Sequence, residues 1–181
     1  RNCRILAPTP NFLKKLVTFV PVANAEKVRK ALFDAGAGHI GNYDSCSFNQ
    51  VGQGSFRGNE QTNPYAGEKN QLHFEDETRI ETVFPSHIQS QVIQALFAAH
   101  PYEEVAYDIY PLDNEYNQSG TGMIGELESP VNELEFLGKL KETFRCQVIK
   151  HTQLLWKPIR KIAVCGGSGS FLLDAAIASG A

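Results

Sequence analysis

The chain has 181 residues, of which 42% are hydrophobic and 20% are charged, and its formal net charge at pH 7 is -3. This composition is typical of a globular protein that can bury one hydrophobic core or two modest ones. A nucleic-acid-binding surface would require a clustered basic excess, which the sequence lacks. No apolar run approaches the roughly 20 residues that span a bilayer, and no signal-peptide pattern is visible. We therefore expect a cytoplasmic protein with neither a nucleic-acid nor a membrane partner.

The four cysteines are scattered, at Cys3, Cys46, Cys146 and Cys165, without a C-x-x-C pair. This spacing argues against a zinc knuckle and against a disulfide framework, and it fits reduced thiols. We expect all four to be small buried hydrophobic side chains.

The first half of the chain begins with a predicted strand and helix. Residues 16–20 form a β-branched and aromatic run that predicts a strand. Asn24 is predicted to cap a helix, because an apolar stripe follows it at helical spacing. Residues 36–38, Gly-Ala-Gly, end this helix, since glycine tolerates the left-handed conformation that helix termini favour.

A glycine- and asparagine-rich segment follows over residues 41–69. It interrupts two strand-like pieces, 45–51 and 55–57, and therefore predicts a long, bent β-arm with a polar loop at its tip. Residues 79–84 then alternate with period two, which predicts another strand.

A second helix and a last strand complete this half. Ser86 and Gln89 form a capping-box pattern before an apolar stripe that runs to Ala99, and Pro101 stops the helix. Residues 104–112 alternate again as a strand. The resulting order of strand, helix, strand, strand, helix, strand is the ferredoxin-like βαββαβ arrangement, with two helices on one face of a four-stranded antiparallel sheet.

The second half follows a polar, glycine-bearing linker at 113–122 and has a different pattern. We expect part of an α/β core domain here, a class whose sheet is parallel. The predicted elements are a short strand at 123–127, a helix after Asn132, strands at 147–152 and 161–165, a glycine turn at 166–170 and a helix at 171–179.

Three segments could carry chemistry, and the first is the turn at 41–46. Asn42 and Asp44 in this glycine-bearing turn could form a cradle for a small molecule or an anion, because backbone N–H groups can converge there. Alternatively, the turn is a plain connection from helix to strand whose Asn and Asp form Asx-turns.

The second segment gathers an imidazole, two carboxylates and a phenol, at His100, Tyr102, Glu103 and Glu104. These groups could bind a ligand or transfer protons. A metal site needs three or four converging ligands, however, and adjacent Glu103 and Glu104 would point to opposite faces of an extended chain. The alternative is a helix stop in which the helix dipole favours a protonated His100.

The third segment is the glycine turn with Gly166, Gly167 and Ser168. It could hold a phosphate at a helix N-terminus or border an active cleft. It lacks the lysine of a P-loop, and it matches neither G-x-G-x-x-G nor G-x-S-x-G. We assign no catalytic residue and no metal ligand within the chain.

Several segments together resemble the Nif-three-like dinuclear metal-centre family, in its YqfO subgroup with a PII- and CutA-like insert domain. They are AGAGHIGNY at 35–43, GQGSF at 52–56, NP at 63–64 with Gly67, HPYEEVAYD at 100–108, and the flanks ILAPT at 5–9, MIGEL at 123–127 and KIAVCGG at 161–167. The resemblance implies the end of the N-terminal core half at 1–13, the insert at 14–112, the linker at 113–122 and the start of the C-terminal core half at 123–181.

The resemblance also implies a function for the whole protein. Family members are homohexamers whose inserts associate as trimers. They carry two divalent metal ions, zinc, iron or similar, and are named GTP cyclohydrolase type-two homologues. The chain is thus expected to be the middle section of a metal-dependent hydrolase of unknown substrate, with both ends cut within a longer protein and the metal ligands outside it. The alternative is a non-catalytic, PII-like module that senses a small ligand.

Overall fold

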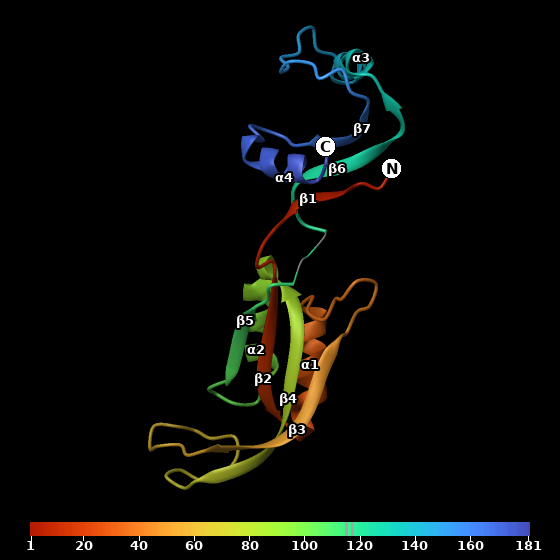
Figure 1. Cartoon of the computed structure of the whole chain (residues 1–181). Helices are drawn as coiled ribbons and strands as arrows, with labels where there is room; N and C mark the ends of the chain where they lie inside the picture. Colours follow the sequence, from red (N-terminus) through yellow and green to blue (C-terminus); the bar gives the residue numbers. More distant parts are fainter. Residues whose placement is uncertain (115, 117) are drawn as a thin grey trace. The chain divides into compact units, whose positions relative to one another are not determined.

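The computed structural model describes residues 1–114, 116 and 118–181. It divides into two compact units, which we call the arm unit, Pro10–Asn114, and the flank unit, Arg1–Thr9 with the chain after 114 (Figure 1). Residues 115 and 117 of the predicted linker lie outside the described part. Among the described residues, no helix is long and apolar enough to cross a membrane. Together the units form a mixed α/β structure with two antiparallel sheets.

The arm unit contains a four-stranded sheet in the order β3-β4-β2-β5, in which every pair of neighbours is antiparallel. Two helices lie on one face of this sheet (Figure 1). The elements are β2 Leu13–Pro21, α1 Ala25–Asp34, β3 Ser47–Phe56, β4 His73–Pro85, α2 Gln89–Ala99 and β5 Tyr107–Pro111.

The core of the arm unit follows from the alternation of its strands. Leu16 and Val20 of β2 and Ile80 and Phe84 of β4 point to the helix side, where each is at most 1% exposed. They pack against buried positions of both helices, including Val28, Leu32, Val92 and Leu96. The alternate residues of the same strands therefore point to the opposite face, which we call the open face.

Both predicted helix caps are wrong. A short 3-10 turn precedes each helix, Val22–Asn24 before α1 and Ser86–Ile88 before α2, and neither helix has a side-chain cap. The amides of Ala25 and Gln89, the first of each helix, donate to the carbonyl oxygens of Val22 and Ser86, so each helix begins through a 3-10 turn instead of a side-chain cap. The Asn24 side chain instead accepts a hydrogen bond from the Tyr65 hydroxyl at 3.3 Å, and Gln89 accepts one from Lys14 at 2.6 Å.

The predicted interruption of the arm is also wrong. β3 is one continuous strand of ten residues, and it pairs with β4 without a register shift from Ser47 opposite Thr82 to Phe56 opposite His73. β4, with 13 residues, is long enough to provide a partner for every residue of β3, so the backbone pairing holds the glycines in an extended conformation. Gly52 and Gly54 lie on the open face as a result.

The flank unit contains a three-stranded sheet in the order β1-β6-β7, and α4 packs against this sheet. Helix α3 instead accepts hydrogen bonds at Glu133 from the amides of Leu155 and Trp156. All its strands pair antiparallel, so the expectation of a parallel sheet is wrong. The pairing of β6 with β1, from the start of the chain, could not be seen in the local sequence pattern. Residues 147–152 form no strand. Asn132 accepts a hydrogen bond from the Glu135 amide at 2.8 Å and so caps α3. The elements are β1 Arg4–Pro8, β6 Gly120–Val131, α3 Glu133–Phe144, β7 Ile159–Val164 and α4 Leu173–Ala178.

The cysteines are free thiols, but none of them is buried. Cys3 and Cys165 are exposed, and Cys46 and Cys146 are partly exposed. The prediction of four buried hydrophobic side chains is therefore wrong. Three of the four lie in the flank unit, where the described residues form a small buried cluster of Leu6, Ile124 and Leu172 that includes no cysteine.

Candidate ligand-binding site on the open face

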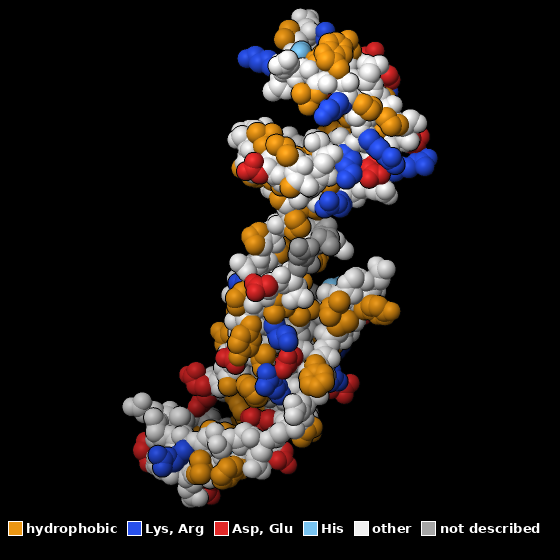
Figure 2. Space-filling model, viewed as in Figure 1, with side chains coloured by type: hydrophobic (Ala, Val, Ile, Leu, Met, Phe, Trp, Pro, Cys, Tyr) orange, Lys and Arg blue, Asp and Glu red, His pale blue; other side chains and the backbone are white. Residues whose placement is uncertain are grey.

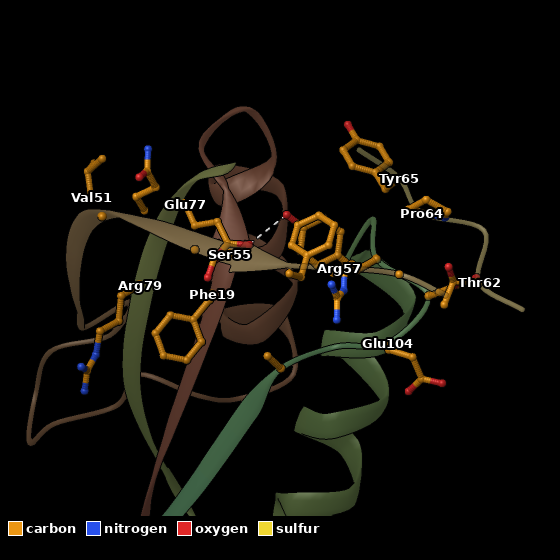
Figure 3. A pocket seen from close by; sticks show the side chains of 18 of the residues that line it. Phe19, Val51, Ser55, Arg57, Thr62, Pro64, Tyr65, Glu77, Arg79 and Glu104 are labelled. Atoms are coloured by element: carbon orange, nitrogen blue, oxygen red, sulfur yellow. Dashed lines mark hydrogen bonds between the residues drawn. The ribbon is translucent and has the colours of Figure 1, made fainter. Parts of the chain in front are cut away.

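A cavity of about 650 Å³ lies on the open face of the arm unit (Figure 3). Its walls come from strands β2, β3 and β4, from the loop between β3 and β4, and from the turn that follows α2. The lining residues are Phe19, residues 50–58, Thr62, Pro64, Tyr65, Glu77, Arg79, Tyr102, Glu103, Glu104 and Ala106. The lining is mainly apolar, with a few polar groups, as in most small-molecule sites.

Two glycines of β3 shape one wall of this cavity. Gly52 and Gly54 are two residues apart, so they present the same face of the strand, where Gly52 pairs with Glu77. A Cβ atom on Gly54 would collide with the Glu77 carboxylate, whereas a Cβ atom on Gly52 would meet no atom within 4 Å. Gly54 thus makes room for the Glu77 side chain, and Gly52 leaves free space beside it.

Glu77 and Tyr102 form the central polar pair of the cavity. Glu77 is only 9% exposed, and its Oε1 accepts a hydrogen bond from the Tyr102 hydroxyl at 2.9 Å (Figure 3). Burial raises the pKa of the Tyr102 phenol well above its ordinary value, and the hydrogen bond to Glu77 and the negative charges of Glu77 and Glu75 raise it further. Tyr102 therefore stays protonated and acts as a donor.

Aromatic contacts connect the Tyr102 ring to the arm. Its centroid lies 5.7 Å from that of Phe56 at the end of β3, in an edge-to-face arrangement, and 6.0 Å from that of Tyr65 in the arm loop. The loop between β3 and β4, residues 57–72, is also held by the Asn63 amide, which donates to Glu103 Oε1 at 2.8 Å. These contacts place the arm at the edge of the cavity.

His100 supports this site from behind rather than lining it. Its ring lies 5.0 Å from the Tyr102 ring, its Nε2 lies 3.0 Å from the carbonyl oxygen of Phe19, and its Nδ1 accepts from the Tyr102 amide at 3.1 Å. These partners require the neutral tautomer with the proton on Nε2. Burial lowers the pKa of His100. The alternative with a protonated His100 is therefore wrong, because a protonated Nδ1 could not accept the hydrogen bond from the Tyr102 amide.

The structure brings Tyr102, Glu103 and Glu104 together in the cavity wall. Residues 101–104 form a bend and β5 begins only at Tyr107, so the extended conformation, in which Glu103 and Glu104 would point to opposite faces, is not present here. Glu103 is held by the Asn63 amide, while Glu104 is exposed at the rim.

The other two predicted segments lie elsewhere. Asn42 and Asp44 are exposed in the loop between α1 and β3, where Asp44 accepts a hydrogen bond from Ser45 at 2.9 Å. Gly166, Gly167 and Ser168 belong to the flank unit, after β7, and precede α4, which has only six residues. Neither segment contributes to the cavity.

Sequence reasoning missed Phe19, Glu77, Arg57 and the glycine wall. The pair Gly52 and Gly54, spaced to share one strand face, was a usable signal, since a strand glycine often marks a close approach of another group. Glu77 gave no such signal, because its partner Tyr102 is 25 residues away.

The metal ions that the resemblance implies find no ligands in the described residues. Within residues 1–114, 116 and 118–181, no group of three or more His, Cys, Asp or Glu side chains could hold a metal ion. We therefore assign no metal ligand and derive no metal-dependent step.

Comparison with known proteins identifies the class. A model of the family described as Duf34/NIF3 (NGG1p interacting factor 3) matches residues 12–181, and the chain belongs to this family. The resemblance of the sequence to the Nif-three-like family is thereby confirmed.

Individual relatives agree. The chain is 42% identical over 182 residues to the GTP cyclohydrolase 1 type 2 homolog of Halalkalibacterium halodurans and 40% identical over 178 residues to that of Bacillus subtilis. It covers 100% and 98% of its own length in these matches, but only 49% and 48% of theirs. The chain thus spans about half the length of the curated relatives it matches.

Solved structures share the fold. The crystal structure of a Bacillus cereus protein related to NIF3 matches all of this chain and 48% of its own, with a TM-score of 0.78 and 44% identity. The Staphylococcus aureus protein SA1388 matches with a TM-score of 0.60 and 22% identity over all of this chain and 46% of its own, which supports the fold alone.

Proposed function

We propose that the arm unit is a ferredoxin-like, PII-like module through which copies of this protein associate as a homotrimer. The observation that carries this proposal is the open face of the four-stranded sheet, which no helix of the unit covers. A sheet of this kind usually buries one face within its own unit and either solvates the other or buries it against a partner.

The side chains on the open face favour a partner over solvent. Phe48 and Tyr110 are 65% and 48% exposed there, beside the ion pairs of Glu81 with Lys15 and Arg79. Figure 2 views this face and shows hydrophobic side chains interspersed with charged ones. Aromatic side chains are enriched at the centre of protein interfaces, and polar groups surround them at the rim.

The edge of the sheet supports the same proposal. β3 is the longer of the two outer strands, and one edge of its ten residues leaves a row of backbone N–H and C=O groups without a neighbouring strand in the unit. Monomeric proteins usually protect such an edge, because it pairs readily with another chain.

Light scattering on residues 1–181 tests this proposal. We expect a mass three times the 20.0 kDa of one chain. Phe48→Glu places a charge at the proposed interface and should yield a monomer. Tyr43→Glu is the matched control, because Tyr43 is 76% exposed in a loop outside the sheet. A monomer of the unaltered chain at high micromolar concentration, or equal loss of the trimer in both variants, would rule the trimer out.

For the longer protein, we propose a cytoplasmic, homohexameric, metal-dependent hydrolase with two divalent metal ions. Its support is the family and the printed name of its relatives, GTP cyclohydrolase 1 type 2 homolog. Paired metals would polarise a substrate and activate water. Turnover by the full-length protein that persists after complete metal removal would contradict this proposal.

A second candidate function is the binding of a small molecule by the arm unit. The cavity supports it, since a volume of about 650 Å³ lies within the range of small-molecule sites. Both candidates place function on the open face, where the cavity lies beside the surface proposed for association.

A further inference from the structure

We infer that the cavity of the arm unit binds a small organic cation, an amine with a flat apolar body, whose ammonium group pairs with Glu77. This inference rests on the second candidate function and names its ligand class. Three observations carry it: one Glu77 oxygen has no partner among the described residues, aromatic side chains line the cavity, and the space beside Gly52 is empty.

The Glu77 carboxylate has one oxygen for which no hydrogen bond is found among the described residues. Its side chain is nine-tenths buried, and one oxygen accepts from Tyr102. Among the described residues, the other oxygen has neither a hydrogen bond nor an ion pair. No side-chain oxygen among the described residues is both buried and without a hydrogen-bond partner, so this second oxygen is accessible from the cavity and can pair with a cation bound there. Because Tyr102 stays protonated, it holds the carboxylate in place.

The basic groups near the cavity do not neutralise Glu77. The Arg79 guanidinium forms an ion pair with Glu81 at 2.9 Å. Arg57 is exposed and takes part in no ion pair among the described residues. His100 is neutral, and both of its ring nitrogens are engaged. The position beside Glu77 is therefore available to a cation from outside.

The rest of the lining suits an organic cation better than a metal ion or an anion. Phe56, Tyr65 and Tyr102 contribute aromatic rings to the lining, and the faces of such rings attract ammonium groups. The Phe19 ring already lies 6.0 Å from the Arg79 guanidinium. A metal ion would need more ligands than this site offers, as no three metal-binding side chains converge in the described chain. An anion would meet three lining glutamates.

The free space beside Gly52 accommodates the body of the ligand. A Cβ atom at Gly52 would meet nothing within 4 Å, so the strand backbone forms a bare wall there. A flat ring can lie against such a wall, with its amine directed to Glu77, which is paired with Gly52 across the strands.

Three probes of one shape and different charge test the inference on the whole chain at pH 7. Tyramine is a cation, 4-ethylphenol is neutral and 4-hydroxyphenylacetate is an anion. Calorimetric titration should show that tyramine binds about tenfold more tightly than 4-ethylphenol, as expected for one charge-assisted hydrogen bond with a cation–π contact, and that the anion binds most weakly. Glu77→Gln retains an acceptor for Tyr102, and it should reduce the tenfold preference to less than about twofold.

Two further variants separate the possible failures. Glu26→Gln removes the same charge from an exposed position of α1 outside the cavity and should retain the preference, while Gly52→Leu fills the free space and should abolish binding of all probes. Equal binding of tyramine and 4-ethylphenol, or an equal effect of Glu77→Gln and Glu26→Gln, overturns the cation inference but not the ligand-binding function. No binding of any probe at 10 mM, or unchanged binding in a Gly52→Leu variant with an unaltered circular dichroism spectrum, overturns both.

Discussion

Both units of this chain combine two helices with an antiparallel sheet, yet they differ in how much apolar side chain they bury. In the arm unit, twelve buried hydrophobic residues form one cluster between the sheet and its two helices. In the flank unit, the buried cluster contains three, and neither α3 nor α4 contributes a buried residue. Large side chains of the flank unit remain exposed instead, with Trp156 at 76% and Ile177 at 70%.

The difference teaches that regular secondary structure does not by itself make a stable unit. A sheet and its helices need a shared apolar interior to offset the conformational entropy that folding removes. The arm unit has such an interior, so we expect it to be the stable part of this chain. The flank unit needs further apolar contacts, which the curated relatives, about twice as long, have additional sequence to supply.

The largest expected effect on stability comes from replacing a buried side chain in the core of each unit separately. Phe84→Ala removes a ring that is 1% exposed and should lower the free energy of unfolding of the arm unit by about 3–5 kcal/mol. Ile124→Ala should destabilise only the flank unit, and by less, because that unit has less packing to lose. Hydrogen exchange followed on separate peptides from β4 and β6 measures both. If either variant accelerated exchange equally in both peptides, the two units would be one cooperative structure.

Substituting one glycine in each unit tests the difference in packing through a smaller change in stability. Gly54→Ala in the arm unit brings a methyl group against the Glu77 carboxylate, so we expect a loss of about 1–2 kcal/mol as the bond to Tyr102 is disturbed. Gly166→Ala in the flank unit meets no atom within 4 Å and should change stability by less than about 0.5 kcal/mol. Urea unfolding monitored by circular dichroism compares them. Similar losses in the two variants would mean that the flank unit is as tightly packed as the arm unit.

The smallest expected effect is a pH dependence confined to the arm unit. Because burial holds the pKa of His100 below its ordinary 6.5, the unfolded chain binds that proton more readily than the folded chain. His100 thus favours the folded arm unit fully above pH 6.5 and progressively less as the pH falls toward its folded pKa. Glu77 and Tyr102 are the titratable groups that face it.

Substitution reveals this contribution. His100→Gln should flatten the decline of arm-unit stability between pH 7.5 and 5.5, whereas His151→Gln, at an exposed position of the flank unit, should leave it unchanged. Urea titrations at a series of pH values measure the slopes. An unaltered slope in His100→Gln would show that another group causes it.

Much of the arm unit could be predicted because its signals are local. The alternation at 79–84 and the apolar stripes of both helices predicted elements that the structure contains. An element buried on one side repeats its apolar residues with the period of a strand or of a helix. The helix starts could not be predicted as well. Ser86 and Gln89 match a capping box, but the Gln89 amide donates to the carbonyl oxygen of Ser86 in a 3-10 turn. The Gln89 side chain accepts a hydrogen bond from Lys14 of β2 instead.

The candidate site was only partly predictable, for a related reason. Tyr102, Glu103 and Glu104 are adjacent in sequence and stood out as a cluster, whereas Glu77 is an ordinary strand glutamate until Tyr102 reaches it. The role of His100 was mistaken, because its position at a helix end suggested a protonated group. Only the tertiary structure shows that Phe19 and Tyr102 surround it and keep it neutral.

The sequence by itself determined the family and the order of elements in the arm unit, since motifs and hydrophobic periods are properties of neighbouring residues. It did not determine the direction of the flank-unit strands, because β1 and β6 are more than a hundred residues apart and their pairing leaves no local pattern. The cavity, too, was decided by tertiary structure alone. Its walls come from three strands, the loop between β3 and β4, and the turn after α2. Glu77, Tyr102 and His100 become buried only when these segments pack together.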